Sequence, residues 1–201
     1  MKFEKTQVSN FEGALRGMRN PLNSWDKSDS SWNPLYIGKN DMNLAQRLIS
    51  AGSEHMKFMR QIFVCVDITA PLYWWKEFDT YKVGTAANST STMHKLTSEP
   101  ITPDKFEWDI DFADYQNQIM DICENLRQKY LETKDKSYWR ALVQVLPEAW
   151  LQTRTVTMSY ANLRTMYFQR RNHKLTEWSK DFCNWVETLP YSKELIMLED
   201  K

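Results

Sequence analysis

The chain has 201 residues, of which 42% are hydrophobic and 26% charged, a composition ordinary for globular proteins that excludes global disorder. Its 26 basic and 26 acidic residues cancel, which argues against wholesale binding of nucleic acid or of an anionic membrane. The length suits a single domain over residues 1–201, with an N-terminal loop and helix region (1–39), a core (40–189) and a C-terminal tail (190–201).

Cysteine usage and hydropathy predict the compartment. The three cysteines, Cys65, Cys123 and Cys183, lie far apart and are odd in number, which argues against a disulfide framework or a zinc site and favours a reducing environment. The first ten residues, MKFEKTQVSN, lack the apolar segment of a signal peptide, and no apolar run is long enough to span a bilayer. We therefore expect a cytoplasmic protein with no membrane partner and no nucleic-acid partner.

The first part of the chain predicts two helices and a strand. Residues 11–19 are predicted to form a short helix, followed by an ordered loop rich in Asn, Ser, Trp and Pro. A second helix is predicted to begin at Asn40 or Asp41, either of which can cap it, and to stop at Gly52. The β-branched and aromatic residues of KFMRQIFVCVDI indicate a strand over residues 56–68.

The rest of the chain is predicted to be mostly helical. LYWWKEFDTYK (72–82) predicts a short helix that leads into a polar loop, and Asp104 is predicted to cap a long helix ending near residue 131. The remaining predicted elements are a helix over 137–150 kinked at Pro147, a strand over 153–158, and helices over 162–171 and 176–189. The pattern is typical of a mixed, helix-rich class with a small sheet.

Candidate chemistry lies in two segments. In YWWKEFDTYKVGTAANSTSTMHKL (73–96), a run of small and hydroxylated residues follows an aromatic helix and can line a site. In YANLRTMYFQRRNHKLTEW (160–178), Arg164 and Arg171 are seven residues apart and share one helix face. Such guanidinium groups grip phosphates, but cations near a helix C-terminus also complement the macrodipole, so both interpretations stay open. No glycine-rich phosphate loop occurs, so a nucleotide site must be built from arginines and hydroxyls.

Several segments, in chain order, resemble the flavin-dependent thymidylate synthase family (ThyX-like proteins). LAQRLISAGSEHMKF (44–58) resembles the family's EH-containing step into a strand. VDITAPLYWWKEFDTYKVGTAANSTSTM (66–93) occupies the place of its RHRxxSxNExSxR signature. The closing pattern is matched by Val145-Leu146-Pro147, then Asn162, Arg164, Arg171 and Trp178.

The signature departs from the family pattern at several positions. Thr80-Tyr81-Lys82 stands in place of RHR, so one positive charge remains. Asn88, after a one-residue insertion, and Ser91 match the signature's asparagine and second serine. The other departures are Ser89 for the glutamate, Met93 for the final arginine, and Val143 for a later arginine, with Arg140 one turn earlier.

The resemblance implies an α+β fold with a small, mostly antiparallel sheet flanked by long helices, and a homotetramer. It implies methylation of dUMP, or a related pyrimidine nucleotide, with methylenetetrahydrofolate, NADPH and reduced FAD. Arg171 and Ser91 would be catalytic. The residues implied to bind FAD are His55, Thr80, Tyr81, Lys82, Asn88, Asn162 and Arg164. Those implied to bind the nucleotide are Ser89, Ser91, Arg140, Arg170 and Arg171.

Three functions stay open at this point. The first is a flavin-dependent thymidylate synthase that methylates dUMP. The second is a flavin enzyme that acts on UMP, dCMP or a hydroxymethylated product. The third is a non-catalytic descendant that keeps the fold as a nucleotide-binding or scaffold protein. The missing arginines favour the third, because a hydrogen bond to a charged group contributes roughly 1.5–3 kcal/mol. Lys82, Arg170 and His94 are the candidates to compensate for them.

Overall fold

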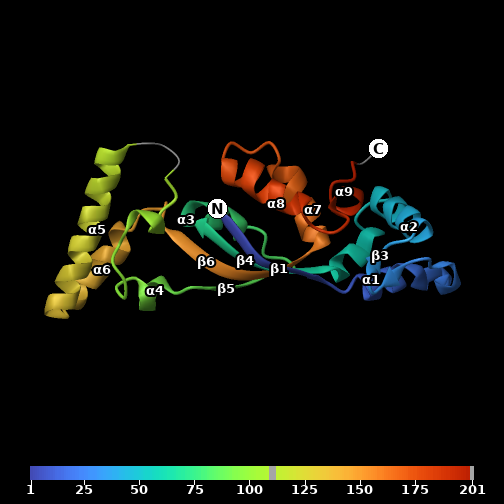
Figure 1. The fold of residues 1–201 in the computed structure, drawn as a ribbon, viewed down its shortest axis with the longest axis horizontal. Coiled ribbons are helices and arrows are strands. Elements are labelled where there is room, and N and C mark those ends of the chain that lie inside the picture. The colour runs from blue at the N-terminus through green and yellow to red at the C-terminus, as the bar shows by residue number, and fades with distance from the viewer. Residues whose placement is uncertain (109–111, 200–201) are drawn as a thin grey trace. The chain divides into compact units, whose positions relative to one another are not determined.

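The computed structural model describes residues 1–108 and 112–199 (Figure 1). The chain divides into two compact units. The first unit comprises Met1–Lys2, Ile68–Thr80 and Asn88–Arg154, and the second comprises Phe3–Asp67, Tyr81–Ala87 and Thr155–Lys201. The chain passes between the units within strands, so several strands contribute residues to both.

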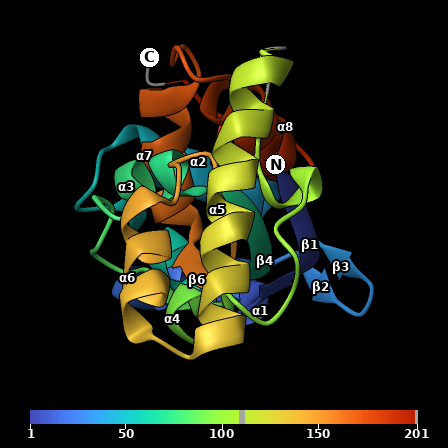
Figure 2. The same cartoon turned by 90° about the vertical axis from the view of Figure 1, so that its left-hand side faces the viewer.

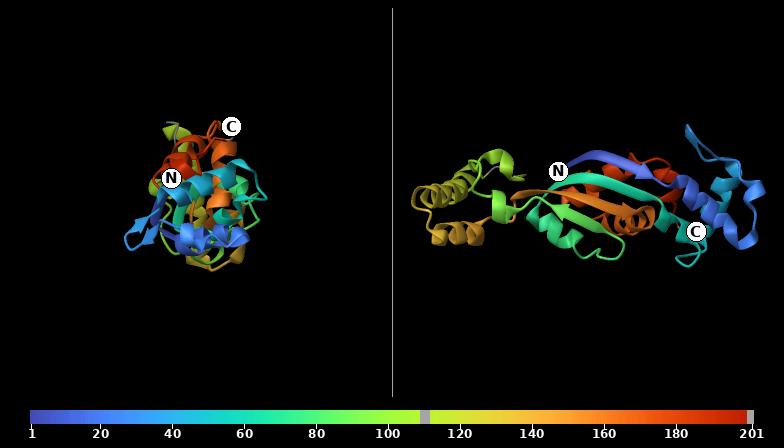
Figure 3. Two further views of the ribbon diagram at one scale, coloured as in Figure 1. Left: turned by 90° about the vertical axis from the view of Figure 1, so that its right-hand side faces the viewer. Right: turned by 90° about the horizontal axis from the view of Figure 1, so that it is seen from below.

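A four-stranded sheet has the order β1-β4-β6-β5, which can be followed in Figure 3. Its strands are β1 (Lys2–Ser9), β4 (Phe63–Pro71), β6 (Leu151–Ser159) and β5 (Ala86–Ser89). Along β4, Val64, Val66 and Ile68 are fully buried and alternate with more exposed residues, as a strand with one covered face requires. A separate antiparallel hairpin pairs β2 (Ser31–Trp32) with β3 (Leu35–Tyr36). The expected α+β class with a small, mostly antiparallel sheet is confirmed.

The first unit carries the longest helix. Its helices are α3 (Leu72–Phe78), α4 (Thr92–Lys95), the 3₁₀ helix η4 (Pro103–Lys105), α5 (Ala113–Thr133) and α6 (Lys136–Val145). Figure 2 shows α5 and α6 side by side. Cys123 of α5 and Leu142 of α6 form a hydrophobic cluster with Leu96, Ile101 and Phe106. On α3, the rings of Trp74, Trp75 and Phe78 lie 4.8–5.3 Å apart between centroids and supply a second apolar block.

The second unit contains the remaining helices. They are α1 (Phe11–Arg19), η1 (Asn20–Leu22), η2 (Trp25–Lys27), α2 (Lys39–Ser50), η3 (Met56–Gln61), α7 (Tyr160–Arg170), the π-helix η5 (Glu177–Phe182), α8 (Cys183–Glu187) and α9 (Ser192–Leu195). Its core includes Leu15, Ile49, Met59, Tyr160 and Trp178, each at most 1% exposed.

The start of α2 differs from the prediction in its cap. The helix begins at Lys39, and neither Asn40 nor Asp41 caps it. Instead the carboxylate of Asp29, in the preceding loop, accepts hydrogen bonds from the backbone N–H groups of Asn40 and Asp41, at 2.9 and 3.1 Å. A side chain from the loop thus satisfies two of the orphan donors of the first turn. Helix α1, in contrast, has the predicted bounds.

The strand predicted over residues 56–68 is half wrong. Its first part is the 3₁₀ helix η3, and β4 begins only at Phe63. Phe58 and Met59 are adjacent and both buried, which a helical turn permits and a strand with one exposed face does not. The β-branched and aromatic composition therefore predicted the strand correctly only from Phe63 onward.

The long helix begins later than predicted. Asp104 lies in η4 rather than at the cap of α5. Phe106 then adopts extended geometry and forms a bridge with Trp150, with the ring centroids 5.4 Å apart. This long-range contact outweighs local helix propensity. The stretch 109–111 of the predicted helix lies outside the described residues.

The helix predicted over 137–150 ends at Val145 rather than continuing through a kink at Pro147. Leu146 leaves helical geometry, with φ of −58° and ψ of 121°, because a following proline disfavours the helical conformation. The region predicted as a helix over 176–189 is split into η5 and α8, and the strand predicted over 153–158 is β6. Strand β1 was not predicted.

Two searches of the described residues gave negative results. No helix there combines the length and apolarity needed to cross a membrane. No three His, Cys, Asp or Glu side chains gather there in a way that could hold a metal ion.

Candidate functional site

Helix α7 presents two arginines on one face. Ser159 caps the helix, and its side chain and that of Asn162 form a reciprocal capping box, which fixes where the helix starts. Arg164, Phe168 and Arg171 then follow at spacings of four and three residues and lie on one side. The guanidinium carbons of Arg164 and Arg171 lie 4.7 and 4.8 Å from the centroid of the Phe168 ring. The predicted shared face is confirmed, and an aromatic ring holds both cations in place.

The C-terminal segment covers this face. Buried Arg164 donates hydrogen bonds to the backbone carbonyls of Ile196, at 2.9 Å, and Leu198. Arg171 is 38% exposed and forms an ion pair with the Glu199 carboxylate at 2.5 Å. The hydrogen bond to Glu199 raises the pKa of Arg171, so its charge is permanent. The two arginines that the resemblance assigns to ligands are therefore paired here with the tail of their own chain.

A second cluster forms around Tyr81. The Tyr81 hydroxyl donates to the side-chain oxygen of Gln169 at 2.9 Å and accepts from Nε of Arg170 at 2.8 Å. The Arg170 guanidinium also lies 4.8 Å from the ring of buried Trp178 and 5.5 Å from that of Tyr81. Of the predicted site residues, Tyr81 and Arg170 are thus in direct contact.

Asn162 links α7 to the loop that replaces the RHR signature. Its Nδ2 donates to the Val83 carbonyl at 2.7 Å, and its Oδ1 accepts from the hydroxyl of Ser159 at 2.7 Å and from its N–H at 3.1 Å. Next to Val83, Gly84 has φ of +77°, and a Cβ there would lie 3.1 Å from Asn162 Oδ1. The turn requires glycine both for its backbone conformation and for this close approach. Asn162 therefore positions the loop from Tyr81 onward.

A cavity of about 1700 Å³ lies within the second unit. His55 lines it, and so do Leu198 and Glu199 of the tail. Its charged lining residues are Arg19, Lys27, Arg47, Glu54, Lys57 and Glu199. Side-chain amides are supplied by Asn20, Asn40, Asn43, Gln46 and Gln61. Arg19 is paired with Asp41, but Lys27, Arg47 and Lys57 still outnumber Glu54 and Glu199. Because amides are also abundant, the lining suits an anionic, hydrogen-bonding ligand.

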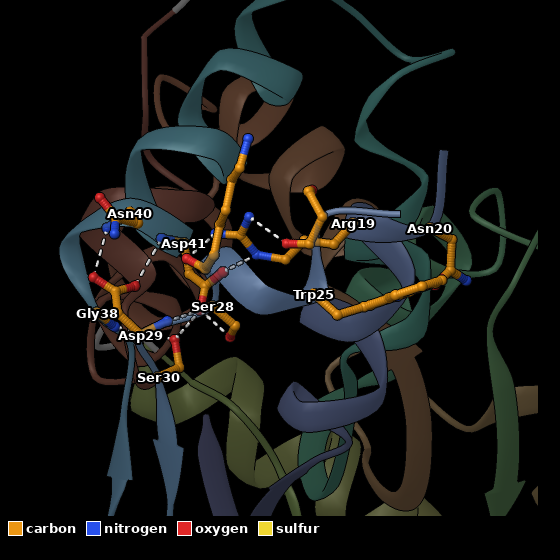
Figure 4. A network of polar contacts seen from close by, with 11 residues as sticks. Arg19, Asn20, Trp25, Ser28, Asp29, Ser30, Gly38, Asn40 and Asp41 are labelled. Atoms are coloured by element: carbon orange, nitrogen blue, oxygen red, sulfur yellow. Dashed lines mark hydrogen bonds and ion pairs between the residues drawn. The ribbon is translucent and has the colours of Figure 1, made fainter. Parts of the chain in front are cut away.

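Arg19, which lines the cavity, forms a buried ion pair with Asp41 (Figure 4). The fully buried Asp41 carboxylate accepts hydrogen bonds from Nε of Arg19 at 2.5 Å and from the hydroxyls of Ser28 and Ser30 at 2.7 and 2.6 Å. Burial opposes ionisation of Asp41, but the bonds from Ser30, Ser28 and Arg19 outweigh it and lower the pKa of the carboxyl. Arg19 also donates to two loop carbonyls, which ties the loop after α1 to α2.

Most of the other predicted site residues lie in the first unit. Thr80 donates its hydroxyl to the Glu77 carbonyl at 2.7 Å, and Ser91 caps α4 by accepting from the His94 N–H at 3.2 Å. The remaining predicted positions in that unit, exposed on β5 or α6, are Asn88, Ser89 and Arg140. Within the described residues, these five form no hydrogen bond or ion pair with one another. Lys82 lies in the second unit and is exposed.

The sequence analysis did not identify two charged residues that form ion pairs in the structure, Glu199 and Arg154. Glu199, the partner of Arg171, lies in a tail that carries no pattern. Arg154 in the first unit pairs with Asp79 at 2.7 Å and lies 4.2 Å over the ring of Trp75. It follows Gln152 by two residues on β6, so strand alternation could have placed both side chains on one face.

The comparisons with known proteins identify the fold. No protein-family model and no curated protein matches the sequence. The structure is similar to that of a flavin-dependent thymidylate synthase, ThyX, from Helicobacter pylori in complex with FAD and dUMP. The TM-score is 0.77 at 17% identity, over 100% of this chain and 99% of that one. A second structure of thymidylate synthase X from the same organism, also with FAD and dUMP, has a TM-score of 0.77 at 16% identity, over 98% of this chain and 97% of that one.

Proposed function

We propose that this chain is a divergent enzyme of the flavin-dependent thymidylate synthase type. It methylates dUMP, or a related pyrimidine nucleotide, with methylenetetrahydrofolate as carbon donor and NADPH as reductant, and works as a homotetramer. The observation that carries the proposal is the arginine pair of α7 beside a large polar cavity, in a fold shared over its full length with structures that hold FAD and dUMP. When bound, the reduced flavin supplies the hydride for this chemistry.

The cavity fits a dinucleotide by size and by donor chemistry. Its volume of about 1700 Å³ exceeds the roughly 300–1,000 Å³ of common small-molecule pockets. The cations and amides around it can neutralise and hydrogen-bond a pyrophosphate. We assign His55 to the wall that receives FAD, with Arg164 and Lys82 as further cations on the same unit. The assignments of Thr80, Tyr81, Asn88 and Asn162 to FAD remain predictions.

The nucleotide is assigned to Arg171. A guanidinium offers paired donors to a uracil carbonyl or a phosphate, and its charge persists at any working pH. Arg171 would hold the ring and polarise the carbonyl, while Arg170, kept rigid by Tyr81 and Trp178, adds positive potential next to it. The roles of Ser89, Ser91 and Arg140 at the nucleotide remain predictions.

Two of the three cysteines are poorly suited to act as nucleophiles. Burial raises the pKa of the Cys123 thiol, and burial together with Glu187 raises that of Cys183 to about 11. Both thiols therefore stay protonated at neutral pH, and a protonated thiol attacks poorly. The proposed chemistry uses neither of these two cysteines.

A non-catalytic nucleotide-binding or scaffold protein is the second candidate. The observation in its favour is that several predicted ligand groups already have partners within the chain. Both ends of the Asn162 amide are bonded, Arg164 donates to tail carbonyls, and Arg170 packs between two rings. A protein that had lost its ligands could satisfy its polar groups in this way.

The two candidates differ in product formation. Purified protein is incubated with FAD, NADPH, methylenetetrahydrofolate and dUMP, and the nucleotides are separated by chromatography. The proposal expects dTMP, and it expects dUMP to be turned over faster than UMP or dCMP. Bound FAD and dUMP without any methylated product would support the non-catalytic candidate. An Arg171→Ala variant serves as control, because it removes the assigned uracil contact.

A further inference from the structure

We propose that Leu198 and Glu199 form a displaceable strap that occupies the arginine face of α7 and competes with an anionic ligand for it, while Met197, whose N–H donates to the Ser192 carbonyl at 2.9 Å, belongs to the fixed part of the chain. The inference rests on the proposed function for the identity of the nucleotide, but the competition itself concerns any anion. The strap carries its own carboxylate to Arg171 through Glu199, and its own carbonyl to Arg164 through Leu198. These groups offer the same acceptor chemistry that a phosphate or a uracil carbonyl offers.

The anchor of the strap is firm. Ile196 is fully buried, and its backbone N–H donates to the Ser192 carbonyl at 2.8 Å, closing the turn of α9. The Tyr191 hydroxyl accepts a hydrogen bond from the Ile37 N–H at 2.9 Å, which ties the start of α9 to the segment before α2. Movement of the strap therefore leaves α9 in place.

The strap itself is held weakly. Among the described residues, the hydrogen bonds and ion pairs of Leu198 and Glu199 are those to Arg164 and Arg171. The Glu199 side chain is 67% exposed, and solvent screens an ion pair of this kind. A ligand with two or more acceptor oxygens can replace a single screened carboxylate at little cost.

The position of the strap links the two halves of the candidate site. Leu198 and Glu199 line the cavity that contains His55, and Glu199 also contacts Arg171. When Glu199 leaves, the Arg171 guanidinium becomes available to a ligand lying in that cavity. The strap is thus a built-in competitor, and the apparent affinity equals the intrinsic affinity multiplied by the fraction of molecules in which the strap is open.

The test compares Glu199→Gln, a truncation after Met197, and Glu194→Gln in otherwise full-length protein. Glu194 lies on α9 and is exposed, so its substitution makes the same charge change away from the arginines. Titration calorimetry with dUMP and with inorganic pyrophosphate measures affinity. The rate at which carboxypeptidase removes the C-terminal residues, followed by mass spectrometry, measures strap release. We expect Glu199→Gln to tighten binding of both probes about two- to fivefold. We expect the truncation to tighten it at least as much, and Glu194→Gln to leave it unchanged.

The digestion experiment has its own expected result. Binding of either probe to the wild type should speed the removal of Glu199 and Leu198 by carboxypeptidase, because the strap is displaced. Equal affinities for all variants, or digestion that slows on binding, would overturn the strap. If no variant binds either probe, the strap and the proposed function both fail. Tighter pyrophosphate binding by the truncated chain, with no binding of FAD or dUMP, would support the strap and reject the proposed function.

Discussion

Two arginine sites in the second unit use the same side chain in opposite ways. Arg19 is 4% exposed, and its donors are directed to a buried carboxylate and two backbone carbonyls. Arg171 is 38% exposed, and its ion-pair partner is the Glu199 carboxylate, whose side chain is itself 67% exposed. A guanidinium that is buried and saturated stabilises a loop, whereas one that is exposed with one displaceable partner is suited to bind a ligand.

The largest expected effect comes from the Arg19 site. Asp41→Ala leaves the Arg19 guanidinium buried without its counter-charge, and we expect it to lower the free energy of unfolding by about 3–5 kcal/mol. Urea denaturation monitored by tryptophan fluorescence measures this. As a control, Glu12→Gln breaks an exposed pair with Arg16 at 3.9 Å and should change stability by no more than about 0.5 kcal/mol. Similar losses for both variants would contradict the distinction between saturated and displaceable arginines.

Asn162 should give an intermediate effect. Asn162→Ala removes the clamp to Val83 and half of the capping box, and we expect a loss of about 1–2 kcal/mol in the free energy of unfolding. Asn162→Asp keeps the acceptor for Ser159 but loses the donor to Val83, so it should fall between wild type and Asn162→Ala. A loss confined to FAD binding, with unchanged stability in both variants, would mean that Asn162 is a ligand group rather than a positioning residue.

The next prediction concerns the pH dependence of stability, and it extends the comparison to the Glu124–Arg127 ion pair in the first unit. The hydrogen bond from Arg127 lowers the pKa of Glu124 to about 2, from an ordinary value of 4.5. Because the folded pKa is depressed, the stability from this group is present above about pH 4.5 and is lost as the pH falls towards 2. Glu124→Gln should therefore flatten the pH dependence of the urea midpoint in this window. A variant with the same acid profile as the wild type would disprove this role for Glu124.

Arg171 should show the smallest effect on stability. Arg171→Ala removes one exposed ion pair and one exposed contact with the Phe168 ring, so we expect a loss of at most about 1 kcal/mol in the free energy of unfolding. The same substitution should weaken dUMP binding about ten- to a hundredfold, because a charge-assisted contact is lost. Calorimetry and denaturation on the same preparation separate the two quantities. Unfolding of the variant would place Arg171 with Arg19 among the structural arginines.

Local patterns in the sequence accounted for part of the fold. Helix α1 has the bounds predicted for it, and the seven-residue spacing of Arg164 and Arg171 predicted their shared face. The shared face depends on helix periodicity alone, which is a property of neighbouring residues. The elements that failed depend on partners far along the chain. Asp29 caps α2 from a loop, and Phe106 is held extended by Trp150.

Strand β1 shows why some elements carry no signal. KFEKTQVS is mostly polar and mostly exposed, so it has little of the apolar alternation that marks a half-buried strand. It is an edge strand, paired on one side, and charged side chains are typical of edges. The C-terminal tail also lacks a sequence signal, because no pattern in the sequence predicts that Glu199 forms an ion pair with Arg171. The candidate site could thus be placed on α7 from the sequence, but its occupation by the tail could not.

The visible absorption spectrum of the purified protein, before and after incubation with FAD and gel filtration, tests the central claim most directly. The account predicts a retained flavin spectrum near one FAD per chain, and a change in that spectrum when dUMP is added to wild type but not to Arg171→Ala. A colourless protein that releases all added FAD would contradict it, and would leave the fold as a scaffold whose arginines are satisfied by the chain itself.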